Sequence, residues 1–422
     1  MSSNKKKLLL HPSMIVTVDT NGVNFKRGGQ MKELALVSGH SVVIENDTIK
    51  DLVPNNHIKN ISEYELIDVK DCTVLPGIIE SHTHTAFAGS RAEEFRKKLS
   101  GVSYEEIARS GGGILTTVNA VRKISSDDFI KLLKPRIQNF IAQGITILEI
   151  KSGYGLDFEN EIKILQVINQ LKRLFPIDII PTFLGAHTYP PEFKDDHEGY
   201  VNLLIGQMLP FIADNKLASF CDVFCEKTAF SANETDLIFT KAASLGLGLK
   251  LHTDQFNSIG GIDIALKHKA VSIDHLEVIP DHYFADLGKS DTVCTLLPGV
   301  SFFLNYNYAP ARKLIDSNAI VSIATDYNPG SSNISSMHLV MSLAALKMKM
   351  SIEEVISSVT INAAKALKIN KTTGSIETGK KADFSVLNTR DYADIVYNIG
   401  SNINIMTIKN GNVIYRSPGG IN

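Results

Sequence analysis

Several features that would narrow the function are scarce or missing in this 422-residue sequence. It has four cysteines, no long apolar run, no low-complexity linker and a formal net charge of -2 at pH 7. Without a run long enough to span a bilayer we expect no membrane partner, and without excess positive charge we expect no nucleic-acid partner. The remaining composition, 44% hydrophobic and 21% charged residues, is typical of a soluble globular protein.

The cysteines indicate neither a disulfide framework nor a cysteine metal site. They form no Cys-x-x-Cys pair, and we interpret them as small buried residues: Cys72, Cys221, Cys225 and Cys294. A reducing cytoplasm is the simplest compartment for such a chain. Near the start, the lysines of 5–7 and the leucines of 8–10 resemble a signal peptide, but the apolar run stops at His11 and is too short. We therefore expect a cytoplasmic protein.

Apolar runs alternate with amphipathic stretches through the middle of the chain. The amphipathic stretches include 127–142, 159–174, 233–245 and 259–267. The apolar runs, which we interpret as buried parallel strands, are 75–80, 146–150, 179–184, 222–225, 247–251, 270–273, 293–297 and 320–324. Eight strand–helix units would close a (β/α)8 barrel. We therefore predict an α/β fold in which residues 73–367 form a TIM-like barrel.

Both ends of the chain have the pattern of short strands and turns instead. Strand-like runs occur at 14–18, 41–44 and 66–69 before the barrel, and at 403–409 and 412–415 after it. Two helical stretches, 335–350 and 352–367, precede the return to β structure. The simplest arrangement pairs the two ends. We therefore predict a small β-sandwich domain that is built from residues 1–72 and 368–422.

The predicted strand ends are rich in histidine. In a parallel barrel the reactive groups belong at the carboxyl ends of the strands. His82 and His84 follow the first run, and because residues two apart in a strand point to the same side, both rings can aim at one point. Later strand ends carry His187, His252, His275 and Asp326. Any one of these could be an ordinary structural residue, and Asp326 could cap a helix, but the joint pattern predicts a metal site.

A hydrolytic metal site needs a few protein ligands and an open position for water. Four residues can supply the ligands: His82, His84, His252 and Asp326. A metal lowers the pKa of water to near 7, so a neighbouring group must accept the proton. Asp326, beside the metal, and His275, on the next strand end, are both candidates for this catalytic role.

These residues resemble the amidohydrolase superfamily, whose pattern is His-x-His on strand one, His on strands five and six, and Asp on strand eight. Within it, the chain resembles the imidazolonepropionase family over nearly its whole length. The specific strings are FAGSRAEEF at 87–95, GGGI at 111–114, EIKSGYG at 149–155, FLGAHT at 183–188, DVFCEK at 222–227 and ATDYNPGS at 324–331. Several unusual strings in the same order make this resemblance specific.

The resemblance implies hydrolysis of 4-imidazolone-5-propanoate to N-formimidoyl-L-glutamate in histidine breakdown. It implies one divalent metal, zinc or iron, on the four ligands named above. It implies a small-molecule substrate that is held by Arg91, Tyr154, His187, Gln255, Asn328, Gly330 and Ser331. Superfamily members of this kind are often dimers, so we expect a homodimer.

The residue types fit such a substrate, a cyclic amide that bears a propionate. Arg91 offers a bidentate fork for the carboxylate, unless it pairs with Glu93 or Glu94 instead. His187 could polarise the ring carbonyl or hydrogen-bond the ring. One departure matters: Gln255 stands where many members carry Glu, and an amide cannot act as a general base. We therefore give Gln255 a binding role.

Three alternatives stay open. An aminohydrolase acting on a purine or pyrimidine would share the ligands but would have no reason to keep Arg91. A non-catalytic scaffold of the dihydropyrimidinase-like kind tends to lose ligands, and none is missing here. Some superfamily members carbamylate a strand-four lysine to bridge two metals; here Glu226 adjoins Lys227, and we expect a structural or ion-paired lysine.

Overall fold

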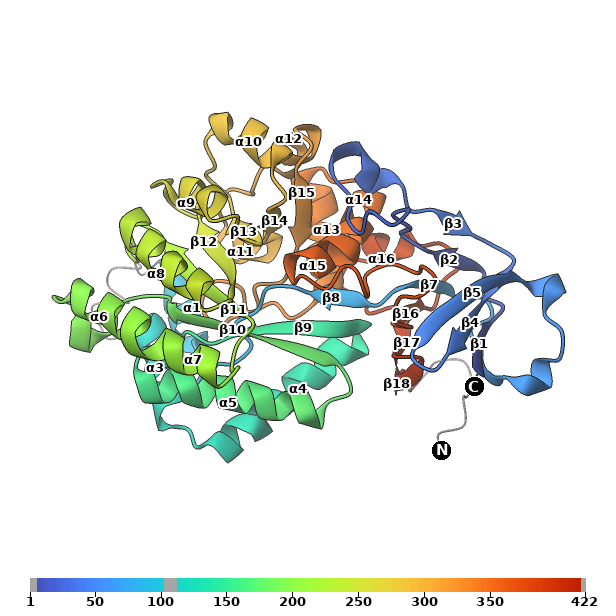
Figure 1. Cartoon of the computed structure of the whole chain (residues 1–422), viewed down its shortest axis with the longest axis horizontal. Coiled ribbons are helices and arrows are strands. Elements are labelled where there is room, and N and C mark those ends of the chain that lie inside the picture. The colour runs from blue at the N-terminus through green and yellow to red at the C-terminus, as the bar shows by residue number, and fades with distance from the viewer. Residues whose placement is uncertain (1–5, 102–111, 419–422) are drawn as a thin grey trace.

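The computed structural model describes residues 6–101 and 112–418, so Gly111 of the glycine string lies outside the described residues. Eight parallel strands form one curled sheet in chain order (Figure 1). They are β8 (Ile78–Glu80), β9 (Ile145–Lys151), β10 (Asp178–Ala186), β11 (Phe220–Cys225), β12 (Gly248–Thr253), β13 (Ser272–His275), β14 (Val293–Leu296) and β15 (Ile320–Ile323). The predicted α/β fold with a TIM-like barrel is confirmed.

The first and last barrel strands meet just beyond their carboxyl ends. Thr83 and Tyr327 form a parallel bridge. The Asp326 N–H donates to the His82 carbonyl at 3.1 Å, and the His84 N–H donates to the Tyr327 carbonyl at 3.1 Å. The backbone therefore ties the segments that carry the first and last predicted ligands directly to each other.

Amphipathic helices cover the outside of this sheet, as the sequence predicts. The longer ones in the first half are α4 (Ser126–Ala142), α5 (Phe158–Leu174) and α8 (Ala232–Ser244). In α4, Phe129, Leu133, Ile137 and Phe140 recur at helical spacing and are fully buried. The N-cap Ser125 begins this helix by accepting a hydrogen bond from the Asp128 N–H.

Further helices follow or precede the barrel strands. They are α1 (Ala92–Leu99), α3 (Ile114–Lys123), α6 (His197–Leu203), α7 (Leu209–Asp214), α9 (Gly261–Lys267), α10 (Phe284–Lys289), α11 (Pro298–Leu304), α12 (Ala311–Asp316), α13 (Met337–Met348), α14 (Ile352–Val359), α15 (Ile361–Ala366) and α16 (Asp394–Tyr397). None of the helices in the described part of the chain is long and apolar enough to cross a membrane.

Two smaller sheets come from the chain ends and lie beside the barrel (Figure 1, right). One has the order β5 (Thr48–Pro54), β4 (His40–Glu45), β1 (Lys6–Leu10), β6 (Glu65–Asp68). The other has the order β18 (Asn412–Arg416), β17 (Asn404–Lys409), β16 (Phe384–Leu387), β7 (Thr73–Pro76), β2 (Met14–Val16), β3 (Leu36–Val37). Leu9 and Ile44 of the first sheet belong to one apolar cluster with Val74 and Phe384 of the second. The domain boundaries at 72/73 and 367/368 stay a prediction.

The predicted strand 75–80 is wrong in its continuity, because Gly77 divides it. Residues before Gly77 form β7, which pairs with β16 in the six-stranded sheet, and residues after it form β8 of the barrel. A β-carbon at Gly77 would lie 2.3 Å from Thr146 Oγ1, so only glycine allows this close passage. The leucines of 8–10, interpreted above only as too short a leader, form strand β1.

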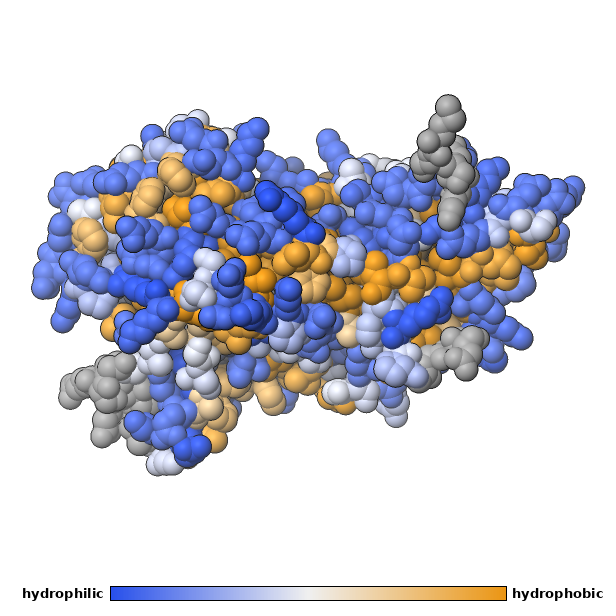
Figure 2. Space-filling view, turned by 90° about the horizontal axis from the view of Figure 1, so that it is seen from below, coloured by the Kyte–Doolittle hydropathy of each residue, from blue (hydrophilic) through white to orange (hydrophobic). Residues whose placement is uncertain are grey.

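The surface is mixed, as the composition indicates. On the face shown in Figure 2, hydrophilic side chains cover most of the surface, and hydrophobic residues gather in a band across the middle. The four cysteines are free and buried, which confirms their interpretation as small buried residues.

Candidate functional site

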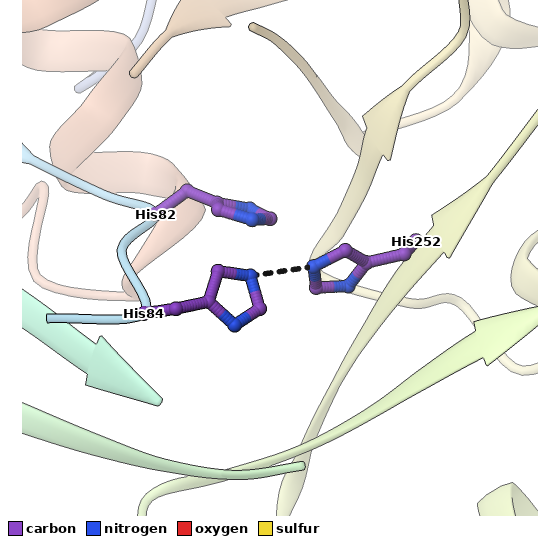
Figure 3. A group of neighbouring side chains, drawn as sticks. All are labelled: His82, His84 and His252. Carbon is purple, nitrogen blue, oxygen red and sulfur yellow. Dashed lines mark hydrogen bonds between the residues drawn. The ribbon is translucent and has the colours of Figure 1, made fainter. Parts of the chain in front are cut away.

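Three histidines converge at the carboxyl end of the barrel (Figure 3). One ring nitrogen from each of His82, His84 and His252 lies within 4.8 Å of the others. Asp326 Oδ1 lies 3.3 Å from His82 Nε2 and 3.2 Å from His84 Nε2. All four residues are at most 3% exposed. The structure therefore brings the four predicted ligands together.

The atoms at the centre of this group fit a cation. His82 Nε2 and Asp326 Oδ1 are buried and make no hydrogen bond with any described residue. The Nε2 atoms of His84 and His252 face each other at 3.2 Å. Buried acceptors in this state cost free energy unless they bind something. Three imidazole nitrogens and one carboxylate oxygen suit a divalent first-row metal such as zinc.

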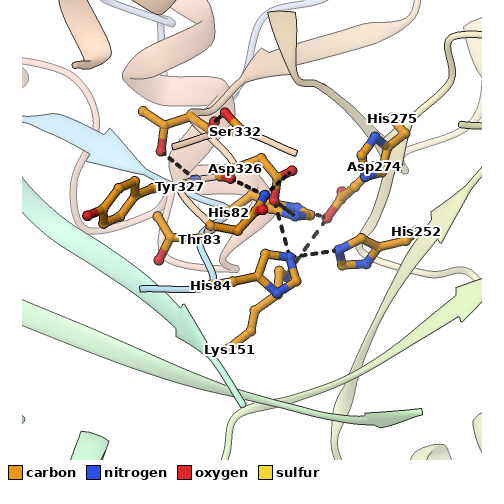
Figure 4. Close-up of polar contacts among 12 residues, drawn as sticks. His82, Thr83, His84, Lys151, His252, Asp274, His275, Asp326, Tyr327 and Ser332 are labelled. Atoms are coloured by element: carbon orange, nitrogen blue, oxygen red, sulfur yellow. Dashed lines mark hydrogen bonds and ion pairs between the residues drawn. The ribbon is translucent and has the colours of Figure 1, made fainter. Parts of the chain in front are cut away.

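Two carboxylates hold these rings from behind, and Figure 4 shows one of them, Asp274, beside His82. Asp274 Oδ2, on β13, lies 2.6 Å from His82 Nδ1, and Asp222 Oδ1, on β11, lies 2.9 Å from His252 Nδ1. When Nδ1–H donates to a carboxylate, the Nε2 lone pair points to the metal position. The sequence analysis did not identify this role for Asp222 or Asp274. The sequence signal that could have revealed it is the position of Asp222 in β11 and of Asp274 in β13, where each is an acidic residue in a buried strand.

The electrostatics of His252 and Asp326 agree with metal binding. At His82, burial is outweighed by the Asp274 and Asp326 carboxylates, which raise its pKa to about 9, so a metal must displace a proton there. Burial lowers the pKa of His252 well below its usual range, so the ring is neutral, as a ligand must be. Burial alone would raise the pKa of Asp326, but its contacts with His82 and His84 hold that pKa well below the ordinary value. Asp326 is therefore ionised and suited to bind a cation.

His275, the last residue of β13, lies beside the metal ligands. Its ring centroid is 5.4 Å from that of His252 and 6.1 Å from that of His82. The backbone at His275 has a φ of 88°, which non-glycine residues rarely adopt. Glu277 Oε1 lies 3.4 Å from His275 Nδ1. Although burial lowers the pKa of His275, Glu277 raises it above its ordinary value.

Two predicted substrate contacts stack beside the metal ligands. The His187 ring lies against His84, with centroids 5.2 Å apart and planes at 25°, and Tyr154 meets His187 edge-on at 5.4 Å. The His187 Nδ1–H donates to the Gly153 carbonyl at 2.9 Å, since a carbonyl oxygen can only accept. Burial lowers the pKa of His187 to about 3, so the ring is neutral. Its Nε2 therefore carries a lone pair and can only accept.

The Arg91 side chain lies over the loop that follows Asp326. A β-carbon at Gly330 would lie 2.1 Å from Arg91 Nη1, so glycine leaves room for the guanidinium. Arg91 Nε donates to Glu94 Oε2 at 2.7 Å, which is one of the two pairings considered above. This hydrogen bond involves only Nε of Arg91 and neither of its Nη groups.

Asn328 organises the same loop from within. Its Oδ1 accepts the N–H groups of Gly330 and Ser331, and its Nδ2 donates to Asp326 Oδ2 at 2.9 Å. This bond fixes the Asp326 carboxylate with Oδ1 towards the histidines. Asp326 does not cap a helix, since α13 begins only at Met337.

The remaining predicted residues lie at the ends of β11 and β12. Gln255 is buried two residues after β12 ends, at 5% exposure. Lys227 is exposed, so it does not occupy a buried position where a carbamate could bridge two metals.

The comparisons identify relatives of this chain. Residues 228–414 match the family model described as Amidohydrolase family. The chain is 40% identical to an imidazolonepropionase of Clostridium tetani over 97% of this chain and 98% of that protein. It is 41% identical to an imidazolonepropionase of Geobacillus thermodenitrificans over 91% of this chain and 92% of that protein.

Solved structures share the fold at low identity. An adenosine deaminase from Xanthomonas campestris with bound zinc has a TM-score of 0.71 and 14% identity, and the match covers 97% of this chain and 92% of that one. An atrazine chlorohydrolase from Arthrobacter aurescens, complexed with zinc, has a TM-score of 0.70 and 15% identity, with 97% and 95% covered. These neighbours show the architecture, whereas the near-complete match to the curated relatives shows the family. The chain therefore belongs to the imidazolonepropionase family of amidohydrolases and is a hydrolase of this type.

Proposed function

We propose that the chain hydrolyses the cyclic amide of 4-imidazolone-5-propanoate to N-formimidoyl-L-glutamate in L-histidine catabolism. It would use one zinc or iron ion at His82, His84, His252 and Asp326. The observation that carries this proposal is the convergence of three imidazoles and a carboxylate whose central atoms lack other partners. A metal bound there would activate water as the nucleophile and polarise the carbonyl.

The reaction moves protons that the chain's own residues must handle. The oxygen of water bonds to the ring carbonyl carbon, the ring C–N bond breaks, and the freed nitrogen takes a proton. We place the transfer on His275, because its ring lies beside that of His252 with Glu277 next to its Nδ1, whereas Asp326 Oδ1 faces His82 and His84. Asp326 then serves as a ligand. The Glu277 carboxylate stabilises the protonated His275 ring between the two proton transfers.

The stacked pair beside the ligands orients the substrate ring. Because His187 Nε2 can only accept, it receives a ring N–H of the substrate and does not polarise the carbonyl. The Tyr154 hydroxyl is the neighbouring donor, and burial raises its pKa so that the proton stays on the oxygen. Gln255, at the end of β12, offers an amide for one further hydrogen bond.

The propionate would bind at the loop after β15. The Nη groups of Arg91 form a fork for the carboxylate. Gly330 leaves the space that the guanidinium needs, and the next residue, Ser331, carries a hydroxyl that hydrogen-bonds the Asn328 side chain. Asn328 holds this loop and the Asp326 carboxylate in place. The homodimeric state and the cytoplasmic location stay predictions.

The direct test is an absorbance assay with freshly made imidazolone propionate, run beside guanine and cytosine. We expect turnover of the first substrate alone. Arg91→Ala should raise KM about 10- to 100-fold with little change in kcat, since a charge-assisted contact to a carboxylate is lost.

Arg96→Ala is the matched control, because Arg96 is exposed, pairs with Glu93 and lies on α1, which begins directly after Arg91. It should leave KM unchanged. An unchanged KM in Arg91→Ala would reject the carboxylate site, and equal turnover of guanine or cytosine would favour the aminohydrolase alternative.

A further inference from the structure

A charged layer fills the barrel interior directly beneath the metal ligands. Its members come from neighbouring strands, and none has any exposed surface: Glu149 and Lys151 on β9, Asp222 on β11, Lys250 on β12 and Asp274 on β13. Charged groups without solvent must be paired to be tolerated. The proposed chemistry does not use either lysine.

Lys151 lies at the centre of this layer. Its Nζ is 2.7 Å from Glu149 Oε1, 2.8 Å from Asp222 Oδ2 and 4.0 Å from Asp274 Oδ2. Although burial lowers the pKa of Lys151, these three carboxylates raise it above the usual range. Lys151 is therefore a permanent cation between the carboxylates.

Two of those carboxylates are the ones that hold the histidine ligands. Asp222 uses Oδ2 for Lys151 and Oδ1 for His252 Nδ1. Asp274 uses Oδ2 for His82 Nδ1, with Lys151 next to the same oxygen. The Lys151 ammonium thus stands directly behind the Asp222–His252 pair, whereas Lys151 and Lys250 lie 4.0 Å and 3.9 Å from the Asp274 oxygen behind His82.

We propose that Lys151 is a positioning residue for the metal centre: its ammonium fixes the Asp222 carboxylate, and through it the His252 ring, in the orientation that binds the metal. Lys151 itself touches neither metal nor substrate. This inference rests on the proposed metal-dependent function.

The physical reason lies in the charge of the layer. With Lys151 in place, two cations face three carboxylates, and without it only Lys250 would remain, 3.9 Å from Glu149 and 3.9 Å from Asp274. The Asp222 carboxylate would lose the bond that fixes its plane, and that plane sets the orientation of the His252 ring. Contacts of this kind behind a ligand typically change metal affinity 10- to 100-fold.

This arrangement also argues against a second metal at Lys151. A carbamate on that nitrogen would replace a cation by an anion next to Glu149, Asp222 and Asp274. Repulsion among four buried negative charges would oppose it. We therefore expect one metal per chain.

The test compares two buried lysines of the full-length protein. Lys151→Met removes the proposed positioning charge. Lys250→Met removes an equally buried charge whose close bond is to the Ser81 carbonyl at 3.2 Å, with the nearest carboxylates at 3.9 Å. Both should lower the melting temperature. Zinc affinity is measured by competition with a chelating dye, and ligand geometry by the visible absorption of the cobalt-substituted protein.

Lys151→Met should weaken zinc binding about 10- to 100-fold and alter the cobalt spectrum, whereas Lys250→Met should change zinc affinity less than about threefold. If Lys151→Met does not fold, Lys151→Gln keeps one donor and should weaken binding about three- to tenfold. Wild-type zinc affinity in the Lys151 variant, or equal weakening in Lys250→Met, would overturn the inference. Failure of the wild-type protein to bind zinc would instead overturn the proposed function.

Discussion

Two buried regions of this chain are equally inaccessible to water but differ in composition: one is apolar and the other is charged. Leu9, Val74 and Phe384 belong to the apolar cluster between the two sheets from the chain ends. Beneath the metal ligands, Lys151 and Asp222 are just as buried. Apolar burial stabilises by about 25 cal/mol per Å², whereas buried charges carry a desolvation penalty and are retained where orientation matters. The first interior holds the chain together, and the second holds the ligands.

The largest effect should follow from the loss of a ligand. Asp326→Ala removes the carboxylate oxygen that faces His82 and His84, so bound metal and turnover should both fall to background. Metal analysis and the imidazolone assay measure this. Asp316→Ala, which changes an exposed aspartate paired with Arg312, is the control. Wild-type metal content in Asp326→Ala would remove Asp326 from the ligand set.

The apolar interior should respond in stability alone. Phe384→Ala leaves a cavity in the fully buried cluster and should cost about 3–5 kcal/mol of stability. Zinc affinity of the folded protein should stay unchanged, because the cluster does not contact the ligands. Leu66→Ala, at a half-exposed position of β6, is the control. Thermal unfolding measures the stability of each variant, and zinc titration measures its metal affinity. Weaker zinc binding by Phe384→Ala would show that the apolar cluster and the metal site are energetically coupled.

The charged interior should respond in metal affinity more than in folding. Asp222→Asn keeps the shape of the side chain but removes the charge shared by Lys151 and His252. Zinc binding should weaken about 10- to 100-fold. Asp178→Asn is the control, because Asp178 is the first residue of β10 and lies at the end of the barrel away from the histidines. It alters a half-exposed aspartate that pairs with Lys409 and should leave zinc affinity unchanged. Identical affinities in the two variants would contradict the account.

The smallest effect concerns His338, a buried residue of α13. Burial lowers its pKa to about 4 from 6.5. As the pH falls below 6.5, His338 becomes protonated in the unfolded chain, whereas in the folded chain it stays neutral until about pH 4. Its stability contribution is therefore complete above pH 6.5 and lost between 6.5 and 4. From pH 7.5 to 5.5 the wild type should lose about 1 kcal/mol more stability than His338→Gln. Parallel pH profiles of the two proteins would refute this.

The barrel and the convergence of the four candidate ligands could be predicted because both depend on local pattern. Apolar runs mark the buried strands, and residues two apart, such as His82 and His84, share a side. The break at Gly77 could not be predicted, since it depends on contact with the distant Thr146. The roles of Asp222 and Asp274 depend on strand register, which aligns Phe224 with His252 and His252 with Asp274. No local pattern contains that register.

The central claim is that this barrel binds one divalent metal and needs it for hydrolysis. It is tested most directly by titrating metal-stripped, full-length protein with zinc while following imidazolone propionate hydrolysis. We expect activity to rise linearly and to level off at one equivalent per chain. Full activity before any zinc is added, or a plateau only at two equivalents, would contradict the claim.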